Sequence, residues 1–153
     1  MKFSTREDVD APIEQVFDML CEFETYERAA MRRGAEVQRK DTLNAPGVGM
    51  KWHAAFSLRG KARDVDVELK GYERPNEIAV LSTSSGLEGQ GVVQLLALSK
   101  TRTRISVDFE VKPTSLPARL LLQSLKVAKT TLTKRFKLRA AQYAKTLEDR
   151  ANA

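Results

Sequence analysis

The last third of the chain contains neither glycine nor proline from Ala118 to about Arg150. Because these two residues most often end a helix, the segment predicts one long helix. At 100° per residue, most of its apolar side chains fall on one broad stripe: Leu121, Leu125, Ala128, Leu132, Phe136, Tyr143 and Leu147. A long helix with one apolar stripe needs another layer of structure to cover that stripe.

The middle of the chain predicts that layer to be an antiparallel sheet. Val65, Val67 and Leu69 alternate with acidic and basic residues, as in a strand with one buried face. Further strands are expected at Met50–Leu58, Ile78–Ser84 and Val92–Leu98, and also at Ile105–Val111. Short turns such as Arg59–Lys61 join them, which favours hairpins over parallel βαβ units.

The first 34 residues predict a strand followed by two short helices. Lys2–Asp10 has a mixed strand pattern, and Ile13, Val16, Phe17 and Leu20 have the spacing of one buried helical face. Asp10 is the expected N-cap of this helix, and Gly34 ends the second helix. The predicted fold is therefore α+β: a single domain over residues 1–153, with a curved antiparallel sheet of about six to seven strands wrapped on a long C-terminal helix.

The composition excludes several classes of protein. No stretch approaches the ~20 apolar residues that cross a bilayer, and the N-terminus lacks the apolar core of a secretion signal. Cys21 is the only cysteine and His53 the only histidine, so neither an internal disulfide nor a His/Cys metal site is expected. By parity His53 lies on the outer face of the sheet. We expect a cytoplasmic protein without metal or cofactor.

The net charge of +6 leaves two interpretations of the long helix. Its basic residues lie mostly opposite the apolar stripe, at Arg119, Lys126, Lys134, Lys137 and Lys145. This face is either simply solvated or a ridge that binds an anionic membrane surface or nucleic acid. The aromatic residues of the helix lie on the apolar side rather than among the cations, and this pattern disfavours nucleic acid as the partner.

Two arginines stand apart from this division. Arg63 shares strand parity with Val65 and Val67, which turns it toward the apolar face of the sheet. Arg139 lies at the edge of the apolar stripe of the helix. Each either extends past the rim into water or supplies a polar anchor inside an apolar pocket.

The order of several short motifs resembles the START-like superfamily, and within it the polyketide cyclase/dehydrase and lipid-transport group also called SRPBCC. The segments that carry the resemblance are Val9–Phe17, Phe23–Tyr26, Pro46–Trp52, Tyr72–Ile78 and Thr101–Ile105. Each is weak alone, but together they span essentially the whole chain. The resemblance implies a helix-grip fold, in which the sheet and the C-terminal helix enclose an apolar cavity.

The resemblance also implies a hydrophobic or aromatic small-molecule ligand of the lipid, quinone or polyketide type. The residues expected around it are Trp52, Phe56, Arg63, Val65, Val67, Phe109, Leu125, Leu132, Phe136, Arg139 and Tyr143. One alternative is that these side chains fill the core and leave no cavity. Another is a cyclase or dehydratase, but no catalytic motif transfers to this sequence. The sequence does not predict an oligomeric state.

Overall fold

The computed structural model describes all 153 residues, which form seven strands and four α-helices beside one 3-10 turn. The elements in chain order are β1 (Lys2–Val9), α1 (Ile13–Leu20), α2 (Phe23–Arg32), β2 (Glu36–Arg39), β3 (Lys51–Leu58), β4 (Lys61–Glu73), β5 (Glu77–Ser84), β6 (Leu87–Ser99), β7 (Arg102–Pro113), α3 (Leu116–Leu125), the 3-10 turn η1 (Lys126–Ala128) and α4 (Lys129–Ala151).

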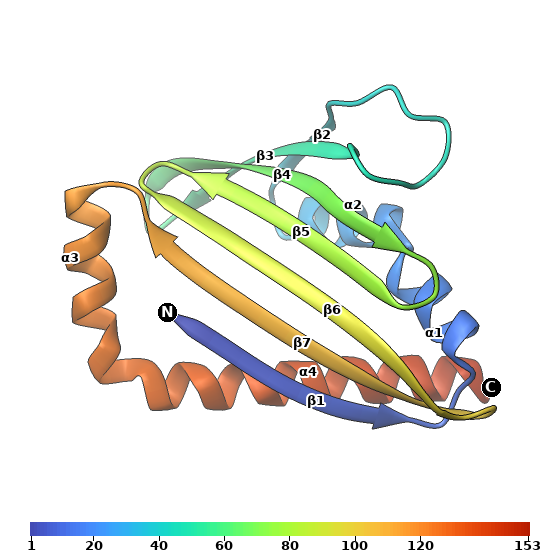
Figure 1. The fold of residues 1–153 in the computed structure, drawn as a ribbon. Coiled ribbons are helices and arrows are strands. Elements are labelled where there is room, and N and C mark those ends of the chain that lie inside the picture. Colours follow the sequence, from blue (N-terminus) through green and yellow to red (C-terminus); the bar gives the residue numbers. More distant parts are fainter.

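All seven strands belong to one antiparallel sheet of order β1-β7-β6-β5-β4-β3-β2. The sheet curves, α1 and α2 lie at one end of it, and α4 runs along β1 (Figure 1). The first strand therefore pairs with the last, and hairpins connect β3 to β7 in succession. This arrangement confirms the predicted α+β class and the helix-grip fold.

Turn chemistry sets the register of the hairpin between β3 and β4. Arg59 and Gly60 both have positive φ, at 53° and 76°, and Leu58 pairs with Lys61 across the turn. Two consecutive residues with positive φ give the turn a twist that matches the twist of the flanking strands. In this register Trp52 faces Val67 while His53 faces Asp66. The predicted placement of His53 on the outer face is thus confirmed, and its Nδ1 lies 2.6 Å from Asp66 Oδ1.

The start of the first helix differs from the prediction. Pro12 rather than Asp10 occupies the N-cap of α1, and no side chain caps this end. Asp10 is used differently: its backbone N–H donates to Glu148 Oε2 of α4, and its carbonyl accepts from the Asn152 side chain. Asp10 therefore fastens the end of α4 to the β1–α1 connection instead of capping α1.

The C-terminal helical segment is bent, whereas the sequence predicted one uninterrupted helix. α3 and α4 meet at a corner at η1, and the two helices point in different directions (Figure 1). Ala118 and Leu122 of α3 are buried, while Leu121 and Leu125 are 49% and 36% exposed. Because α3 turns away at the corner, Leu121 and Leu125 do not continue the buried stripe of α4.

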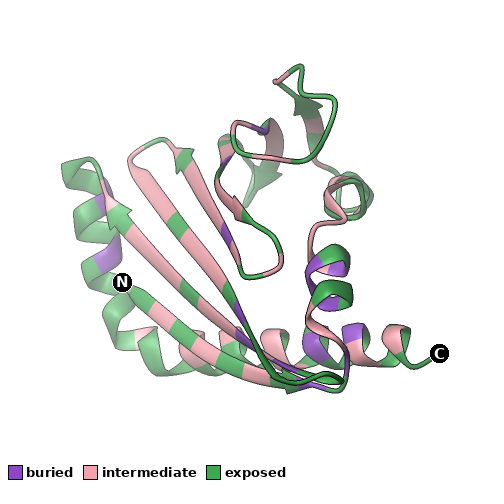
Figure 2. Ribbon diagram, turned by 45° about the vertical axis from the view of Figure 1, so that its right-hand side comes forward, coloured by how far each residue is buried: buried purple, intermediate pink, exposed green.

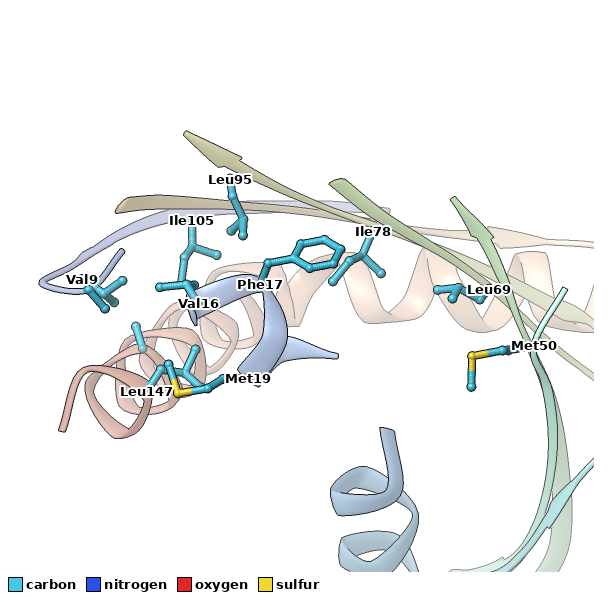
Figure 3. Packing of buried hydrophobic residues seen from close by; sticks show 12 residues of the cluster. Val9, Val16, Phe17, Met19, Met50, Leu69, Ile78, Leu95, Ile105 and Leu147 are labelled. Atoms are coloured by element: carbon cyan, nitrogen blue, oxygen red, sulfur yellow. The ribbon is translucent and has the colours of Figure 1, made fainter. Parts of the chain in front are cut away.

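The core lies at the end of the sheet where α1 and the last turns of α4 meet β6 and β7 (Figure 3). Phe17 and Val16 of α1 are fully buried there, and Leu147 of α4 is 1% exposed. Burial of each such side chain contributes about 1.5–3 kcal/mol. Apolar side chains of α1 thus pack against both α4 and the sheet and join the two.

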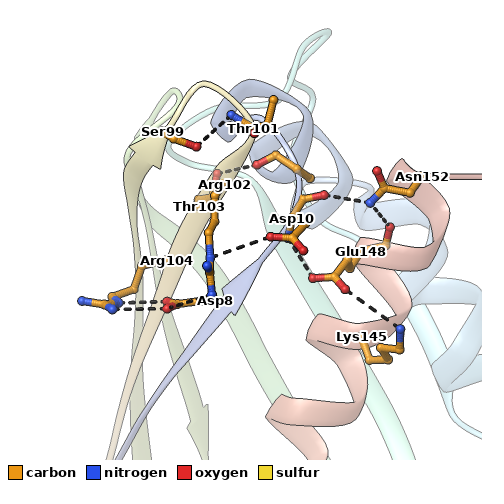
Figure 4. Close-up of polar contacts among 11 residues, drawn as sticks. Asp8, Asp10, Ser99, Thr101, Arg102, Thr103, Arg104, Lys145, Glu148 and Asn152 are labelled. Carbon is orange, nitrogen blue, oxygen red and sulfur yellow. Dashed lines mark hydrogen bonds and ion pairs between the residues drawn. The ribbon is translucent and has the colours of Figure 1, made fainter.

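Polar contacts close the same end of the molecule (Figure 4). Thr103 is the one buried polar residue, and its Oγ1 donates to the carbonyl of Ala11 at 2.8 Å. On the outer side, Arg104 makes a two-pronged contact with the carboxylate of Asp8. These contacts join β7 to β1 and to the segment that leads into α1.

Only 15 of the 153 residues are buried, so the core does not extend over the whole concave face of the sheet. Most strand residues away from this end are intermediate in exposure (Figure 2). Val80, Val93 and Val107 on the concave face are accordingly only partly buried.

Candidate functional site

An apolar pocket of about 350 Å³ lies between α2 and the concave face of the sheet. Strands β2 to β6 form its floor and α1 and α2 its outer wall. Twelve of its thirteen lining residues are hydrophobic: Leu20, Phe23, Tyr26, Ala30, Val37, Trp52, Ala54, Val67, Leu69, Ile78, Val80 and Val93. The thirteenth is Glu27. Such a surface favours apolar molecules, since it offers very few hydrogen-bonding groups.

The indole of Trp52 is held from three sides. Its Nε1–H donates to Glu27 Oε1 at 2.7 Å, and the Phe23 ring centroid lies 5.5 Å from its own. The Arg39 guanidinium carbon lies 5.5 Å from the indole ring centroid, within the range of a cation–π contact. Trp52 is thereby fixed as a wall of the pocket, with its only polar atom already paired.

Asp41 holds Arg39 in this position. The guanidinium donates to both carboxylate oxygens of Asp41, which also accepts from the backbone N–H groups of Leu43 and Lys51. The Arg39 hydrogen bonds, together with those backbone N–H groups, keep the pKa of Asp41 well below its usual range. The loop after β2 is consequently tied to the rim of the pocket.

Helix α2 has an apolar side of which only Phe23 packs against the core. Phe23, Glu27 and Ala30 follow one another at helical spacing on the side that lines the pocket, yet no residue of α2 is buried. An amphipathic helix of a globular protein normally buries this side. In this protein the rest of that side faces the pocket, which therefore takes the place of most of the core contact.

The pocket brings together only part of the predicted ligand-binding set. Trp52 and Val67 line it. Val65 pairs with the lining residue Ala54, and Phe56 pairs with Arg63 farther toward the β3–β4 turn. Arg63 is exposed, as expected for an arginine that extends past the rim.

The other predicted residues lie outside the pocket lining, nearer α4. Phe109 packs over Gly89 and Gly91, where a Cβ on Gly89 would lie 3.2 Å from its ring. Phe136 contacts Phe3 at 5.7 Å between ring centroids. Leu132 is intermediate in exposure, while Arg139 and Leu125 are exposed. A role of these residues in binding stays a prediction.

Tyr143 reaches the pocket indirectly. Its hydroxyl lies 2.7 Å from that of the lining residue Tyr26, which in turn donates to the carbonyl of Leu20. Burial and the Tyr143 hydroxyl together raise the pKa of Tyr26 above its ordinary value. The pair links α2 to α4 beside the pocket.

The contribution of α2, β5 and β6 to the pocket was not predicted from the sequence. The helical spacing of Phe23, Tyr26, Glu27 and Ala30 was a usable signal, since it gives α2 an apolar side with one carboxylate in it. By contrast, no local pattern distinguishes Val80 and Val93 from ordinary core residues of a strand.

Neither of the two remaining reactive side chains forms a catalytic pair. Burial raises the pKa of the Cys21 thiol to about 11, which keeps it protonated and unreactive at neutral pH. His53 lies on the opposite, outer face of the sheet beside Asp66.

No helix of the structure combines the length and the hydropathy needed to cross a membrane.

Comparison with known proteins identifies the fold. No family model matches the sequence, and neither does any curated protein. Solved structures do match. A protein of Thermus thermophilus superposes with a TM-score of 0.64 at 15% identity, covering 99% of this chain and 97% of its own. The Zhui aromatase/cyclase of a Streptomyces species superposes with a TM-score of 0.60 at 13% identity, covering 88% and 89%.

A third match is to a protein described as a member of the START superfamily. This protein, from Mycobacterium smegmatis, has a TM-score of 0.56 at 14% identity and covers 88% of this chain and 95% of its own. Identities this low establish the fold alone. The seven-stranded curved sheet, the two short helices after β1 and the C-terminal helix give this chain the helix-grip fold, which it shares with these solved structures.

Proposed function

We propose that this protein binds an apolar or aromatic small molecule, of the lipid, quinone or polyketide type, in the pocket between α2 and the sheet. The observation that carries the proposal is the composition of the pocket: Glu27 is its only charged lining residue, and that carboxylate accepts from Trp52. A volume of about 350 Å³ suits a molecule of one or two rings or part of an acyl chain.

Two further properties support the proposal. The START superfamily protein and the aromatase/cyclase share this fold, and an apolar ligand is consistent with both descriptions.

We also propose that the chain acts as one domain in the cytoplasm. The lone free thiol of Cys21 supports this location.

The enzymatic alternative has less support. A cyclase or dehydratase needs several polar groups converging on its substrate. Arg63 and Arg139, the arginines expected to supply them, are both exposed and lie outside the pocket lining. Binding without chemistry therefore fits the pocket better.

Trp52 makes the proposal testable, because it is the only tryptophan and lines the pocket. Native mass spectrometry of the purified protein should show a bound molecule that denaturation releases. After delipidation, naphthoquinone or palmitate should change the Trp52 emission in a saturable manner. Absence of any bound molecule, together with a linear and unsaturable response to both probes, would overturn the proposal.

A further inference from the structure

We infer that the corner between α3 and α4 docks on an anionic lipid bilayer. The surface in question, here called the corner surface, comprises the exposed side chains of α3 and η1 with the first turn of α4. Its apolar members are Leu116, Leu120, Leu121, Leu125 and Val127. This inference concerns a different region from the proposed ligand pocket and does not depend on it.

The apolar part of the corner surface is unusually exposed. Val127 is 93% exposed at the tip of the bend, and Leu116 and Leu120 are 67% and 58% exposed. Helix α3 buries Ala118 and Leu122 against the protein. It also carries exposed aliphatic side chains on its outer side. A helix that exposes several aliphatic side chains beyond its buried face normally uses them to contact a partner or a membrane.

The charge around these side chains has a single sign. Between Glu110 and Glu148 the chain contains nine lysines and arginines and no acidic residue. The rest of the chain then has 17 basic and 20 acidic residues, a balance of −3. The excess positive charge of the protein therefore belongs entirely to this segment.

The cations at the corner are also free to bind a partner. Arg119, Lys126 and Lys129 are exposed and form no ion pair, whereas Lys112 and Lys145 at the two ends of the segment are paired with acidic residues. Lys126 and Lys129 flank the protruding Val127 in sequence. Aliphatic side chains that enter the interface, beside lysines that meet anionic headgroups, are the features of a peripheral membrane contact.

Other occupants fit less well. Nucleic-acid surfaces of the sequence-tolerant type carry exposed aromatic side chains for base stacking, but every exposed apolar residue of the corner surface is aliphatic. A second copy of the chain would bring the same uncompensated cations against each other across a symmetric contact. A bilayer with anionic headgroups is the partner that satisfies both the aliphatic and the cationic groups.

The test is flotation of the full chain with vesicles of phosphatidylcholine, with and without phosphatidylglycerol as about a third of the lipid. We expect binding to the anionic vesicles that weakens as salt rises. Val127→Ser should weaken it by about fivefold or more, and the pair Lys126→Glu and Lys129→Glu by more than about tenfold.

Matched variants away from the corner serve as controls. Val48→Ser changes a valine that is 59% exposed in the loop after β2, and the pair Lys40→Glu and Lys100→Glu makes the same change in charge. Both should bind as the parent does. So should a variant whose pocket is filled by Ala54→Phe, which separates this inference from the proposed ligand.

Three results would overturn the inference. One is equal loss of binding in the control variants, and another is no binding to anionic vesicles at low salt. The third is tight binding to duplex DNA, or a dimer in sedimentation, that the charge reversals abolish while vesicle binding persists unchanged.

Discussion

The hydroxyl groups of Tyr26 in α2 and Tyr143 in α4 lie 2.7 Å apart, across 117 residues of sequence. Because Tyr26 donates its single hydroxyl hydrogen to the carbonyl of Leu20, Tyr143 must be the donor in this pair. Each tyrosine is more than a third exposed, yet the two hydroxyls connect the pocket-lining helix directly to the C-terminal helix. This hydrogen bond joins α4 to α2, whereas apolar contacts join α4 to α1.

The direction of this hydrogen bond leads to a prediction for two conservative variants. Tyr143→Phe removes one donor and should lower the free energy of unfolding by about 1 kcal/mol. Tyr26→Phe removes the shared acceptor and also leaves the Leu20 carbonyl unpaired, so its cost should be larger, about 1–3 kcal/mol. Urea denaturation of both variants and of the double variant gives the coupling energy. Additive costs would show that the two hydroxyls do not interact in solution.

Thr103 carries a second prediction, for the closed end of the molecule. Its buried Oγ1 donates to the Ala11 carbonyl, so Thr103→Val keeps the shape and removes the donor. The unpaired carbonyl should cost about 1–3 kcal/mol in the free energy of unfolding. The matched control is Thr83→Val, an exposed threonine on strand β5, which should change stability by less than about 0.5 kcal/mol. Equal effects of the two substitutions would contradict this assignment.

Much of the fold could be predicted from the spacing of apolar residues and from the residues at turns, as two segments show. Val65, Val67 and Leu69 alternate over a run that only a strand can satisfy, and Arg59 and Gly60 adopt the positive φ of a two-residue hairpin turn. Each signal lies within a few residues of the structure that it specifies. Local physics was therefore sufficient for the strands and for their antiparallel order.

The bend at η1 has no such local signal. Lys126, Val127 and Ala128 are acceptable within a helix, and the segment contains neither glycine nor proline. α3 is instead directed by its packing beside the β5–β6 turn. There, a Cβ on Gly86 would lie 2.7 Å from Ser115 Oγ and 3.2 Å from the Ala118 Cβ. Because this contact joins residues about thirty positions apart, a helical wheel could not reveal it.

The position of the pocket was only partly predictable for the same reason. Strand parity correctly turned Trp52 and Val67 inward, and both line the pocket. Which helix stands opposite them depends on tertiary packing. The C-terminal helix was expected there, but the lining residues on the helical side come from α1 and α2.

A third prediction concerns access to the pocket. Ala54 lines it from strand β3, so Ala54→Phe places a ring inside the cavity. We expect the saturable response of Trp52 to naphthoquinone to weaken by about tenfold or more, which corresponds to roughly 1.4 kcal/mol of binding free energy. Ala62→Phe, at an exposed position on β4, should bind as the parent does. Thermal melting of both variants shows whether the fold persists, and unchanged affinity in a folded Ala54→Phe variant would place the ligand elsewhere.

The last prediction uses the thiol of Cys21 as a reporter of alkaline stability. Burial, aided by the negative charge of Asp18, raises its pKa from 9.0 to about 11. The folded state therefore holds this proton more tightly than the unfolded chain does. Its contribution to stability is complete below pH 9.0 and is lost as the pH rises toward 11.

Replacing the thiol separates this contribution from that of the lysines, which titrate at high pH in both proteins. Between pH 8 and pH 11 the unfolding free energy of the parent should decline more steeply than that of Cys21→Ala, since groups that do not interact with Cys21 titrate alike in both proteins. The measurement is urea denaturation at intervals of about half a pH unit. Reaction with a thiol reagent at pH 8 adds a kinetic check, because roughly one thiol in a thousand is then ionised. Parallel pH profiles of the two proteins, or rapid modification of the folded parent, would show that Cys21 is accessible to water rather than packed against the core.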